Sequence, residues 1–279
     1  MREKQKFSLK TIPTQILVIF AAFLFMAPLY IVLNYSFKTR QELFTSNPLA
    51  LPQSLSLENY LRAFERLNLT TTLFNTMFYT IAAVTILVII CGPAAWAIAR
   101  NKGRFYKFIY IYFVIGIMIP AQALFLPMYI VGFNLGLVNN RMGVVFMFVA
   151  TNLSFAIFLL TSFMSTVPIE LEESARIDGC SIYMTYFLIV MPLLKPAIAT
   201  LIIMQSFQIW NDYLMSSLFV STQSLRPMTV ALQALFSQHT SEYSTAFAAI
   251  VLTSLPMIVL FVSLQRYFIK GMTAGAVKG

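Results

Sequence analysis

Six long stretches without a charged side chain constrain this chain more than any other feature of its sequence. They are residues 11–37, 67–99, 108–140, 142–169, 196–211 and 243–265. A helix needs about 20 apolar residues to cross the hydrocarbon core of a membrane. Only the fifth stretch is shorter, and it continues past Asp212 to Val220. The apolar residues are continuous rather than alternating, which argues against a transmembrane β-barrel.

The composition indicates the same class of protein. Hydrophobic residues make up 59% of the 279 residues and charged residues 10%, whereas soluble domains carry about 25% charged residues. We therefore predict an all-α, polytopic membrane protein with six transmembrane helices in a single transmembrane domain, residues 1–279. The expected helices cover about 15–37, 74–99, 106–131, 142–165, 192–220 and 244–268. The first is too long for a cleaved signal peptide.

The distribution of basic residues predicts the orientation of these helices. With the N-terminus inside, 13 lysines and arginines fall in cytosolic segments and 6 in outer segments. Cytosolic loops typically carry such an excess, so we expect both termini in the cytosol of a multi-pass protein of the cell membrane. The net charge of +9 comes from residues that flank the spans, and it therefore gives no reason to expect a nucleic-acid partner.

An acidic segment interrupts the apolar sequence at about residues 166–191. Four of the ten acidic residues of the chain lie within nine positions of it: Glu170, Glu172, Glu173 and Asp178. Pro168 suits the first turn of a helix, carboxylates suit the same end, and Gly179 can end a helix in the left-handed conformation. We therefore predict a short cytosolic helix over 168–179 and a second one, capped by its first residue, over 181–189.

The side chains of the first short helix are expected on two faces. At 100° per residue, Glu172, Glu173 and Arg176 share one face, and Glu172 and Arg176 are spaced for an i,i+4 ion pair. Ser174 and Ala175 lie on another face, where small side chains allow a second surface to approach closely. A helix that only rests on lipid headgroups is the alternative, although four carboxylates have the wrong sign for anionic lipids.

The acidic segment resembles the EAA loop of inner-membrane permeases in binding-protein-dependent ABC importers. That pattern reads Glu-Ala-Ala, three residues, Gly, nine residues, Ile, one residue, Leu-Pro. Its positions here are Glu173, Ser174, Ala175, Gly179, Ile189, Met191 and Pro192. Ser174 and Met191 depart from the pattern with side chains of similar size. The resemblance implies a coupling helix for an ATPase, with the coupling residues Glu172, Glu173, Ser174, Ala175, Arg176, Asp178, Gly179, Ile189 and Pro192.

Other residues narrow the resemblance to the second permease of carbohydrate importers of the maltose type. They are ELEESARIDG at 170–179, Trp-Asn-Asp at 210–212, and RYFIKGMTAGAVKG from Arg266 onward. The resemblance implies a subunit that moves a sugar or oligosaccharide into the cytosol. It also implies four kinds of partner, namely a second homologous permease, two ATPase subunits, an extracytoplasmic sugar-binding protein and the surrounding membrane lipid.

No catalytic site is expected in the chain itself. None of its ten glycines belongs to a GxxxxGK[ST] phosphate loop, and no nucleophile or acid–base set is present. We therefore expect a non-catalytic subunit without a cofactor, and the resemblance implies that ATP and Mg²⁺ bind to partner subunits. Cys91, Cys180 and the single His239 cannot form a metal cluster, and the positions of the cysteines do not favour a disulfide.

Polar residues in the fifth expected span indicate a substrate path. Gln205, Gln208, Asp212 and Ser216 recur at three- and four-residue steps, which predicts one polar helical face near mid-membrane. An ionisable residue at such a depth usually faces a polar interior. The candidate path residues are Gln205, Gln208, Trp210, Asn211, Asp212 and Tyr213. Hydrogen bonding to the partner permease is the alternative explanation for this stripe.

Two other functions compete with a sugar importer. A proton-coupled secondary transporter would use Asp212, but an intramembrane acid without a partner base argues against a proton relay. Such transporters also usually contain internal repeats, which the sequence does not show. A membrane-embedded enzyme would need a reactive set of side chains, and none is present in the sequence.

Overall fold

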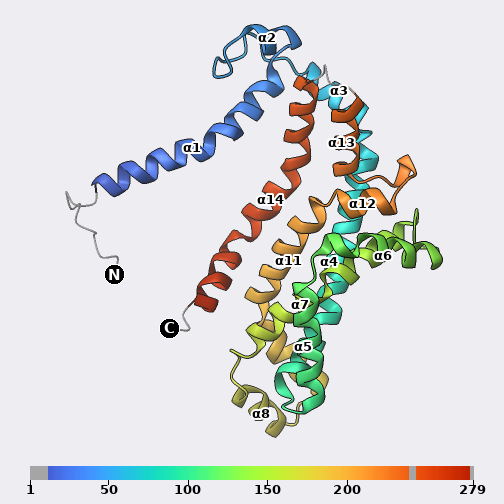
Figure 1. The fold of residues 1–279 in the computed structure, drawn as a ribbon. Helices are drawn as coiled ribbons and strands as arrows, with labels where there is room; N and C mark the ends of the chain where they lie inside the picture. The colour runs from blue at the N-terminus through green and yellow to red at the C-terminus, as the bar shows by residue number, and fades with distance from the viewer. Residues whose placement is uncertain (1–11, 239–242, 277–279) are drawn as a thin grey trace. The chain divides into compact units, whose positions relative to one another are not determined.

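The computed structural model describes residues 12–238 and 243–276, and the regular structure in these ranges is helical throughout (Figure 1). The chain forms two compact units. The first contains the described residues up to Leu69 together with Leu232–Ser254. The second contains Thr70–Ala231 and the described residues from Leu255 onward. The expected all-α fold is confirmed in this part of the chain.

The first unit holds the N-terminal helix and the segment that follows it. Its helices are α1 (Ile12–Phe37), α2 (Arg40–Thr45) and α3 (Glu58–Arg66), with the later part of α13 (Met228–Gln238) and the first part of α14 (Tyr243–Ala276). Tyr35 of α1 packs edge-on against Phe247 of α14, with ring centroids 5.2 Å apart. This aromatic contact joins sequence segments of the unit that are more than 200 residues apart.

Lys38, directly after α1, is buried although it carries a charge. Its Nζ donates hydrogen bonds to Ser46 Oγ and to the carbonyl oxygen of Asn47, each at 3.0 Å. Asn59 Nδ2 of α3 donates to the carbonyl oxygens of Ser36 and Lys38, each at 2.9 Å. Because buried polar groups are costly unless they are hydrogen-bonded, these contacts fix the loop to the end of α1.

Glu42 closes a capping box at the start of α2. The Thr39 N–H donates to Glu42 Oε2 at 2.7 Å, and Thr39 Oγ1 accepts from the Glu42 N–H at 3.3 Å. The other carboxylate oxygen accepts from the Gln53 N–H at 2.8 Å. These backbone donors, Thr39 first and Gln53 second, lower the pKa of the Glu42 carboxyl group below its ordinary value.

The second unit contains the remaining helices. They are α4 (Leu69–Arg100, except its first residue), α5 (Arg104–Met118), α6 (Ala121–Asn134), α7 (Arg141–Met164), α8 (Glu170–Ile177), α9 (Ile182–Met184), the π-helix η2 (Thr185–Val190), α10 (Met191–Leu193), α11 (Lys195–Trp210), α12 (Leu214–Phe219) and the 3₁₀ turn η3 (Gln223–Leu225). The start of α13 and the end of α14 complete it. In this unit α7 packs against both α5 and α11.

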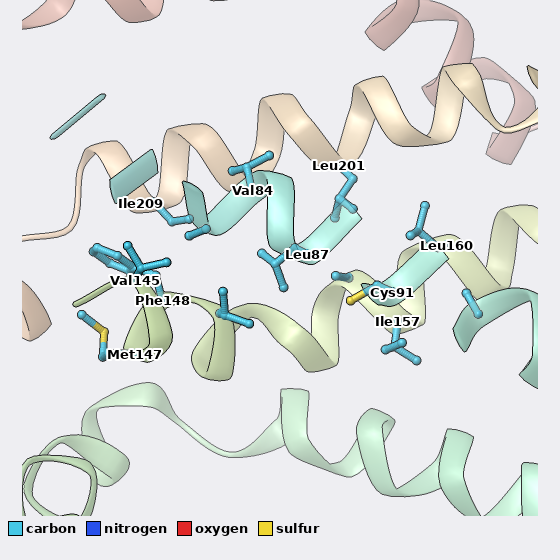
Figure 2. Close-up of a cluster of buried hydrophobic side chains, with 14 of the residues drawn as sticks. Val84, Leu87, Cys91, Val145, Met147, Phe148, Ile157, Leu160, Leu201 and Ile209 are labelled. Carbon is cyan, nitrogen blue, oxygen red and sulfur yellow. The ribbon is translucent and has the colours of Figure 1, made fainter. Parts of the chain in front are cut away.

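The core of the second unit lies among α4, α7 and α11 (Figure 2). Each helix contributes apolar side chains that are almost fully buried. The labelled residues include Val84, Leu87 and Cys91 of α4, Val145, Phe148, Ile157 and Leu160 of α7, and Leu201 and Ile209 of α11. Because lipid is as apolar as these side chains, van der Waals packing rather than the hydrophobic effect is the main attraction between membrane helices.

Four helices in the described residues are long and apolar enough to cross a membrane. They are α1, α4, α7 and the Tyr243–Gln265 part of α14. Two further spans are obtained if each of two bent helix pairs counts as one, Arg104–Met118 with Ala121–Asn134 and Ile182–Leu193 with Lys195–Trp210. The expected multi-pass helical architecture is confirmed, and up to six spans are present by length and composition.

The third expected span is not one continuous helix. Instead of a single helix over 106–131, α5 ends at Met118 and α6 begins at Ala121, with a bend of 104° between them. Pro120 causes this break, because a proline disfavours helical geometry in the residue before it. Ile119 accordingly has φ −78° and ψ 122°. The expected helix over 106–131 is therefore two helices, which count as one span only if the bend lies within it.

The fifth expected span is also interrupted. A helix over 192–220 was expected, but α11 starts at Lys195 and ends at Trp210, and α12 starts only at Leu214. Pro192 lies in the one-turn helix α10 rather than at the start of the span. Asp212 follows the end of α11, with its N–H bonded to the carbonyl oxygen of Ile209 at 3.2 Å. The expected continuous polar stripe is therefore divided by a break.

Candidate functional site

The acidic helix α8 ends as its sequence predicts. Gly179 has φ +83°, its N–H donates to the Arg176 carbonyl oxygen at 3.1 Å, and the Cys180 N–H donates to the Ala175 carbonyl oxygen at 3.0 Å. This pair of bonds is the Schellman motif, which favours glycine at the left-handed position. The start of the helix differs from the expectation: Pro168 lies outside it, because α8 begins at Glu170.

Glu172 of α8 contacts α4 of its own chain rather than its neighbour in the helix. Its Oε1 accepts from Arg100 Nε at 2.8 Å and lies 2.7 Å from Arg100 Nη2. Its Oε2 accepts from Trp96 Nε1 at 2.9 Å. The prediction of an ion pair between Glu172 and Arg176 was therefore wrong, because the carboxylate is bound by residues 72 and 76 positions earlier.

The other polar side chains of α8 face outward. Glu173, Ser174 and Arg176 are exposed in this chain, whereas Glu172 and Ala175 are buried. Asp178, at the C-terminal cap, is also exposed. The expected face shared by Glu172 and Glu173 is therefore divided, and Ala175 lies on the inner side instead of forming an outer surface with Ser174. The outward residues are those that a second protein can reach.

The segment after α8 is helical but not regular. Ser181 caps α9 by accepting a hydrogen bond from the Met184 N–H at 3.3 Å, as its position predicts. The expected second helix then continues as the π-helix η2, which contains Ile189, before α10 with Pro192. π-helical turns are rare in proteins, and those that occur are often found at functional sites. Tyr186 in η2 packs on Trp96, with ring centroids 5.4 Å apart.

The residues of the expected polar stripe lie in two different environments. Gln205 and Trp210 are buried inside the second unit, whereas Gln208, Asn211 and Tyr213 are exposed. Gln205 is fully buried, and neither atom of its side-chain amide has a hydrogen-bond partner among the described residues. A buried amide without a partner costs about 1–3 kcal/mol, so this position favours water or a polar ligand beside it.

A cavity of about 300 Å³ opens at the break between α11 and α12. Gln208, Asn211, Asp212 and Tyr213 line one part of it. The other lining residues come from α6, α7 and α12: Ala121, Gln122, Phe125, Met147, Phe148, Thr151, Asn152, Leu214 and Met215. Amide, hydroxyl and carboxylate groups thus lie beside aromatic rings, a combination that suits a hydroxyl-rich ligand with an apolar ring face.

Asp212 is half-buried at this cavity and organises the break. Its Oδ1 accepts from both the N–H and the hydroxyl of Ser216, each at 2.8 Å. Its carbonyl oxygen accepts from Thr229 Oγ1 at 2.6 Å. The two stripe residues Asp212 and Ser216 therefore bond to each other across the first turn of α12.

Sequence reasoning missed Trp96, Arg100, Gln122 and Asn152. The first two lie at the end of an apolar helix, where a basic residue is explained by orientation alone and a tryptophan by the membrane interface. The one signal in the sequence that could have pointed to Arg100 was the small number of charged residues, because an acidic residue beside a span needs a partner of opposite charge. Asn152 hydrogen-bonds the Phe148 carbonyl oxygen at 2.8 Å, and its own Oδ1 has no partner among the described residues.

Metal ligands do not gather in the part of the chain that the structure describes. No group of three histidine, cysteine, aspartate or glutamate side chains there has the geometry to hold a metal ion. Cys91 is a free buried thiol, and Cys180 is free and half-buried.

The chain matches a known family over most of its length. The family model described as the inner membrane component of binding-protein-dependent transport systems matches residues 89–274. This range contains α8, Gly179, the cavity residues and most of the core of the second unit.

Two curated relatives cover nearly the whole chain. The probable starch degradation products transport system permease protein AmyC of Thermoanaerobacterium thermosulfurigenes is 36% identical over 255 residues, which are 91% of this chain and 92% of that protein. The melibiose/raffinose/stachyose import permease protein MelC of Bacillus subtilis is 35% identical over 253 residues, which are 90% and 91% of the two chains.

The fold also matches a solved structure. One chain in the crystal structure of a bacterial ABC transporter involved in the import of the acidic polysaccharide alginate superimposes with a TM-score of 0.82. The match covers 95% of this chain and 100% of that chain, at 23% sequence identity. At this identity the similarity concerns the fold alone.

Proposed function

We propose, since this chain belongs to the family of inner membrane components of binding-protein-dependent transport systems, that it is the permease subunit through which an ABC importer moves a sugar or oligosaccharide into the cytosol. The names of AmyC and MelC, which refer to starch degradation products and to melibiose, raffinose and stachyose, support a carbohydrate substrate. The family favours this function over the proton-coupled secondary transporter that would use Asp212.

The observation that carries the proposal is the geometry of α8. The EAA-type spacing coincides with a short helix that Gly179 ends in the left-handed conformation. Glu173, Ser174 and Arg176 face away from this chain. A compact helix with exposed charges beyond the end of a span is the kind of element that fits a cleft on a second protein. We assign these residues, with Asp178, Ile189 and Pro192, to contact with or support of an ATPase subunit.

The family, whose description names binding-protein-dependent transport, supports a set of proposed partners. The complex would contain a second homologous permease, two ATPase subunits and an extracytoplasmic sugar-binding protein. ATP and Mg²⁺ would bind to the ATPase subunits, and this chain would carry neither a cofactor nor a catalytic site. The 13-to-6 distribution of basic residues supports an orientation with both termini and α8 in the cytosol.

The cavity at the α11–α12 break is the candidate substrate path. Gln208, Asn211, Asp212 and Tyr213 line it, while the buried Gln205 and Trp210 would support its wall. Hydrogen bonding of the same residues to the partner permease remains the competing function of this surface. If these residues line the substrate path, mutants of Gln208 and Asn211 should lower the affinity for sugar. If they bind the partner permease, the same mutants should weaken assembly of the complex.

Reconstitution tests the proposed function. The chain would be placed in liposomes with its partner permease and ATPase subunits, and uptake of radiolabelled maltotriose and raffinose would be measured with the cognate binding protein present. We expect uptake of at least one probe that requires ATP and that continues when an ionophore collapses the proton gradient. Uptake that stops with the ionophore and proceeds without ATP would contradict the proposal.

A further inference from the structure

One face of α4 is occupied by the acidic segment. Gly92, Trp96 and Arg100 follow each other at four-residue intervals, so they lie in one row along the last turns of the helix. The hydroxyl of Tyr186 fills the space where a side chain at Gly92 would begin. Trp96 packs on the ring of the same tyrosine. The π-helix η2 thus packs against the Gly92 and Trp96 end of the row.

The Trp96 and Arg100 end of the row binds α8 and the residues before it. Arg100 donates from Nε to Glu172 Oε1 at 2.8 Å and from Nη2 to the Val167 carbonyl oxygen at 2.9 Å. Trp96 Nε1 donates to the second oxygen of Glu172 at 2.9 Å. Both carboxylate oxygens are therefore engaged, and the guanidinium holds the helix together with the turn that leads into it.

These contacts are shielded from solvent. The side chain of Glu172 is 4% exposed and that of Arg100 is 16% exposed. In such surroundings an ion pair is screened little by salt, and removing one partner leaves the other charge buried and unpaired. Glu173, the next residue, is exposed. Two adjacent glutamates thus lie in different surroundings, Glu172 against α4 and Glu173 exposed on this chain.

We propose that Glu172 is a positioning residue that holds α8 on the end of α4, so that a displacement of α8 passes directly into that membrane span. Glu172 does not contact the ATPase in this scheme, and its role differs from that of Glu173. The proposal rests on the proposed function, in which an ATPase subunit moves α8. The clasp formed by Glu172, Arg100 and Trp96 makes α8 and the end of α4 one rigid body, which the covalent connection through α5, α6 and α7 would not do.

The test measures the distance between α8 and α4 in the complete transporter. Nitroxide labels would be attached to Cys180 and to a cysteine at the exposed position Ile89, with the buried thiol removed by Cys91→Ala. The sample contains the partner permease and both ATPase subunits, and pulsed electron resonance is recorded with and without ATP and Mg²⁺. With Glu172 intact we expect one narrow distance distribution that ATP leaves unchanged.

The Glu172→Gln variant keeps the shape of the side chain and removes its charge. We expect a broader distribution, a further change on addition of ATP, and a loss of ATP-driven uptake of about fivefold, within the range by which mutations in coupling networks change allosteric coupling. Trp96→Phe removes the indole donor and part of the ring that packs on Tyr186, but it leaves the ion pair with Arg100 in place, so it should give a smaller change of the same kind. The matched control is Glu170→Gln, which removes an exposed carboxylate from the same helix.

The double variant Glu172→Gln/Arg100→Gln should disturb the distance less than the two single changes added together, since no unpaired charge remains. A Glu172→Gln distribution as narrow as that of Glu170→Gln would overturn the proposal. Failure of the ATPase subunits to co-purify with the unmutated chain would contradict the proposed function instead. The label distances in that sample would still decide whether Glu172 holds α8 on α4.

Discussion

Asp212 Oδ1 accepts two hydrogen bonds from Ser216, one from its backbone N–H and one from its hydroxyl, each at 2.8 Å. The carboxylate therefore does for the first turn of α12 what a capping residue does at a helix start, and it does so beside the polar cavity. This arrangement requires a hydrogen-bond acceptor at residue 212, and it does not require the side chain to gain and lose a proton.

Asp212→Asn should consequently be milder than Asp212→Ala. Asparagine retains an acceptor for Ser216, whereas alanine removes it at a cost of about 1 kcal/mol, as for a lost helix cap. We expect uptake to fall clearly in Asp212→Ala and to be largely retained in Asp212→Asn. Size-exclusion chromatography of the complex would show whether alanine also weakens assembly. Complete loss of uptake in Asp212→Asn would contradict the capping role.

The effect of a substitution at Gly179 should depend on how readily the new residue adopts a positive φ, and not on the size of its side chain. The φ of Gly179 is +83°, and no described residue other than its two chain neighbours has an atom within 4 Å of the place where a Cβ would be added. A side chain in the left-handed region costs about 1–2 kcal/mol, except that asparagine adopts it more readily. Uptake should therefore be highest with glycine, lower with asparagine, and lowest, to a similar extent, with alanine and leucine. Ser174→Ala is the control, and equal uptake in Gly179→Leu would refute the role of this turn.

Cysteine labelling in intact cells would test the orientation. In a background lacking Cys91 and Cys180, we place single cysteines at Leu55 and at Gly103, both of which are exposed. A membrane-impermeant maleimide added from outside should react at position 55 and not at position 103. Both should react after the membrane is permeabilised. Reaction at position 103 in sealed cells would reverse the predicted topology.

Gly143 should be the glycine least tolerant of a methyl group among those that the structure describes. A Cβ there would overlap the carbonyl group of Leu137, which is backbone and cannot rotate away. Overpacking typically costs about 1–3 kcal/mol, so Gly143→Ala should lower the melting temperature of the purified chain. Gly103→Ala is the matched control, because its nearest neighbour atom would be Tyr106 Cδ2 at 3.7 Å. Equal melting temperatures would contradict the described packing.

The loop after α1 should loosen in acid. Hydrogen bonds from the Thr39 and Gln53 N–H groups lower the pKa of Glu42 in the folded chain. A lowered pKa means that the carboxylate stabilises the fold above the unfolded value of about 4.3, and that this stabilisation is lost as the pH falls through the folded pKa. As the pH falls through the folded pKa of Glu42, the rate of hydrogen exchange of residues 38–53, corrected for its intrinsic pH dependence, should therefore increase. Glu42→Gln should show the loosened loop already at neutral pH.

Much of the fold follows from local sequence. The charge-free runs predict where membrane-length helices lie, since an unpaired polar backbone cannot exist in lipid and helices satisfy it within the segment. Gly179 and Ser181 mark helix ends correctly, because capping depends on one or two neighbouring residues. The break at Pro120 was open to prediction from the proline, but prolines also occur inside α1, α4, α6 and α14 without ending them.

Local sequence patterns are sufficient to predict a multi-pass helical protein whose spans are interrupted by an acidic helix that Gly179 ends. The role of each charge on that helix depends instead on how the helices pack. Helical periodicity, at about 100° per residue, is compatible with Glu172 and Glu173 on one face, and the local spacing favours Arg176 as the partner of Glu172. The actual partners, Arg100 and Trp96, arrive from α4. A buried charge is satisfied by the nearest group in space, and distance in space is set by packing, which no local pattern records.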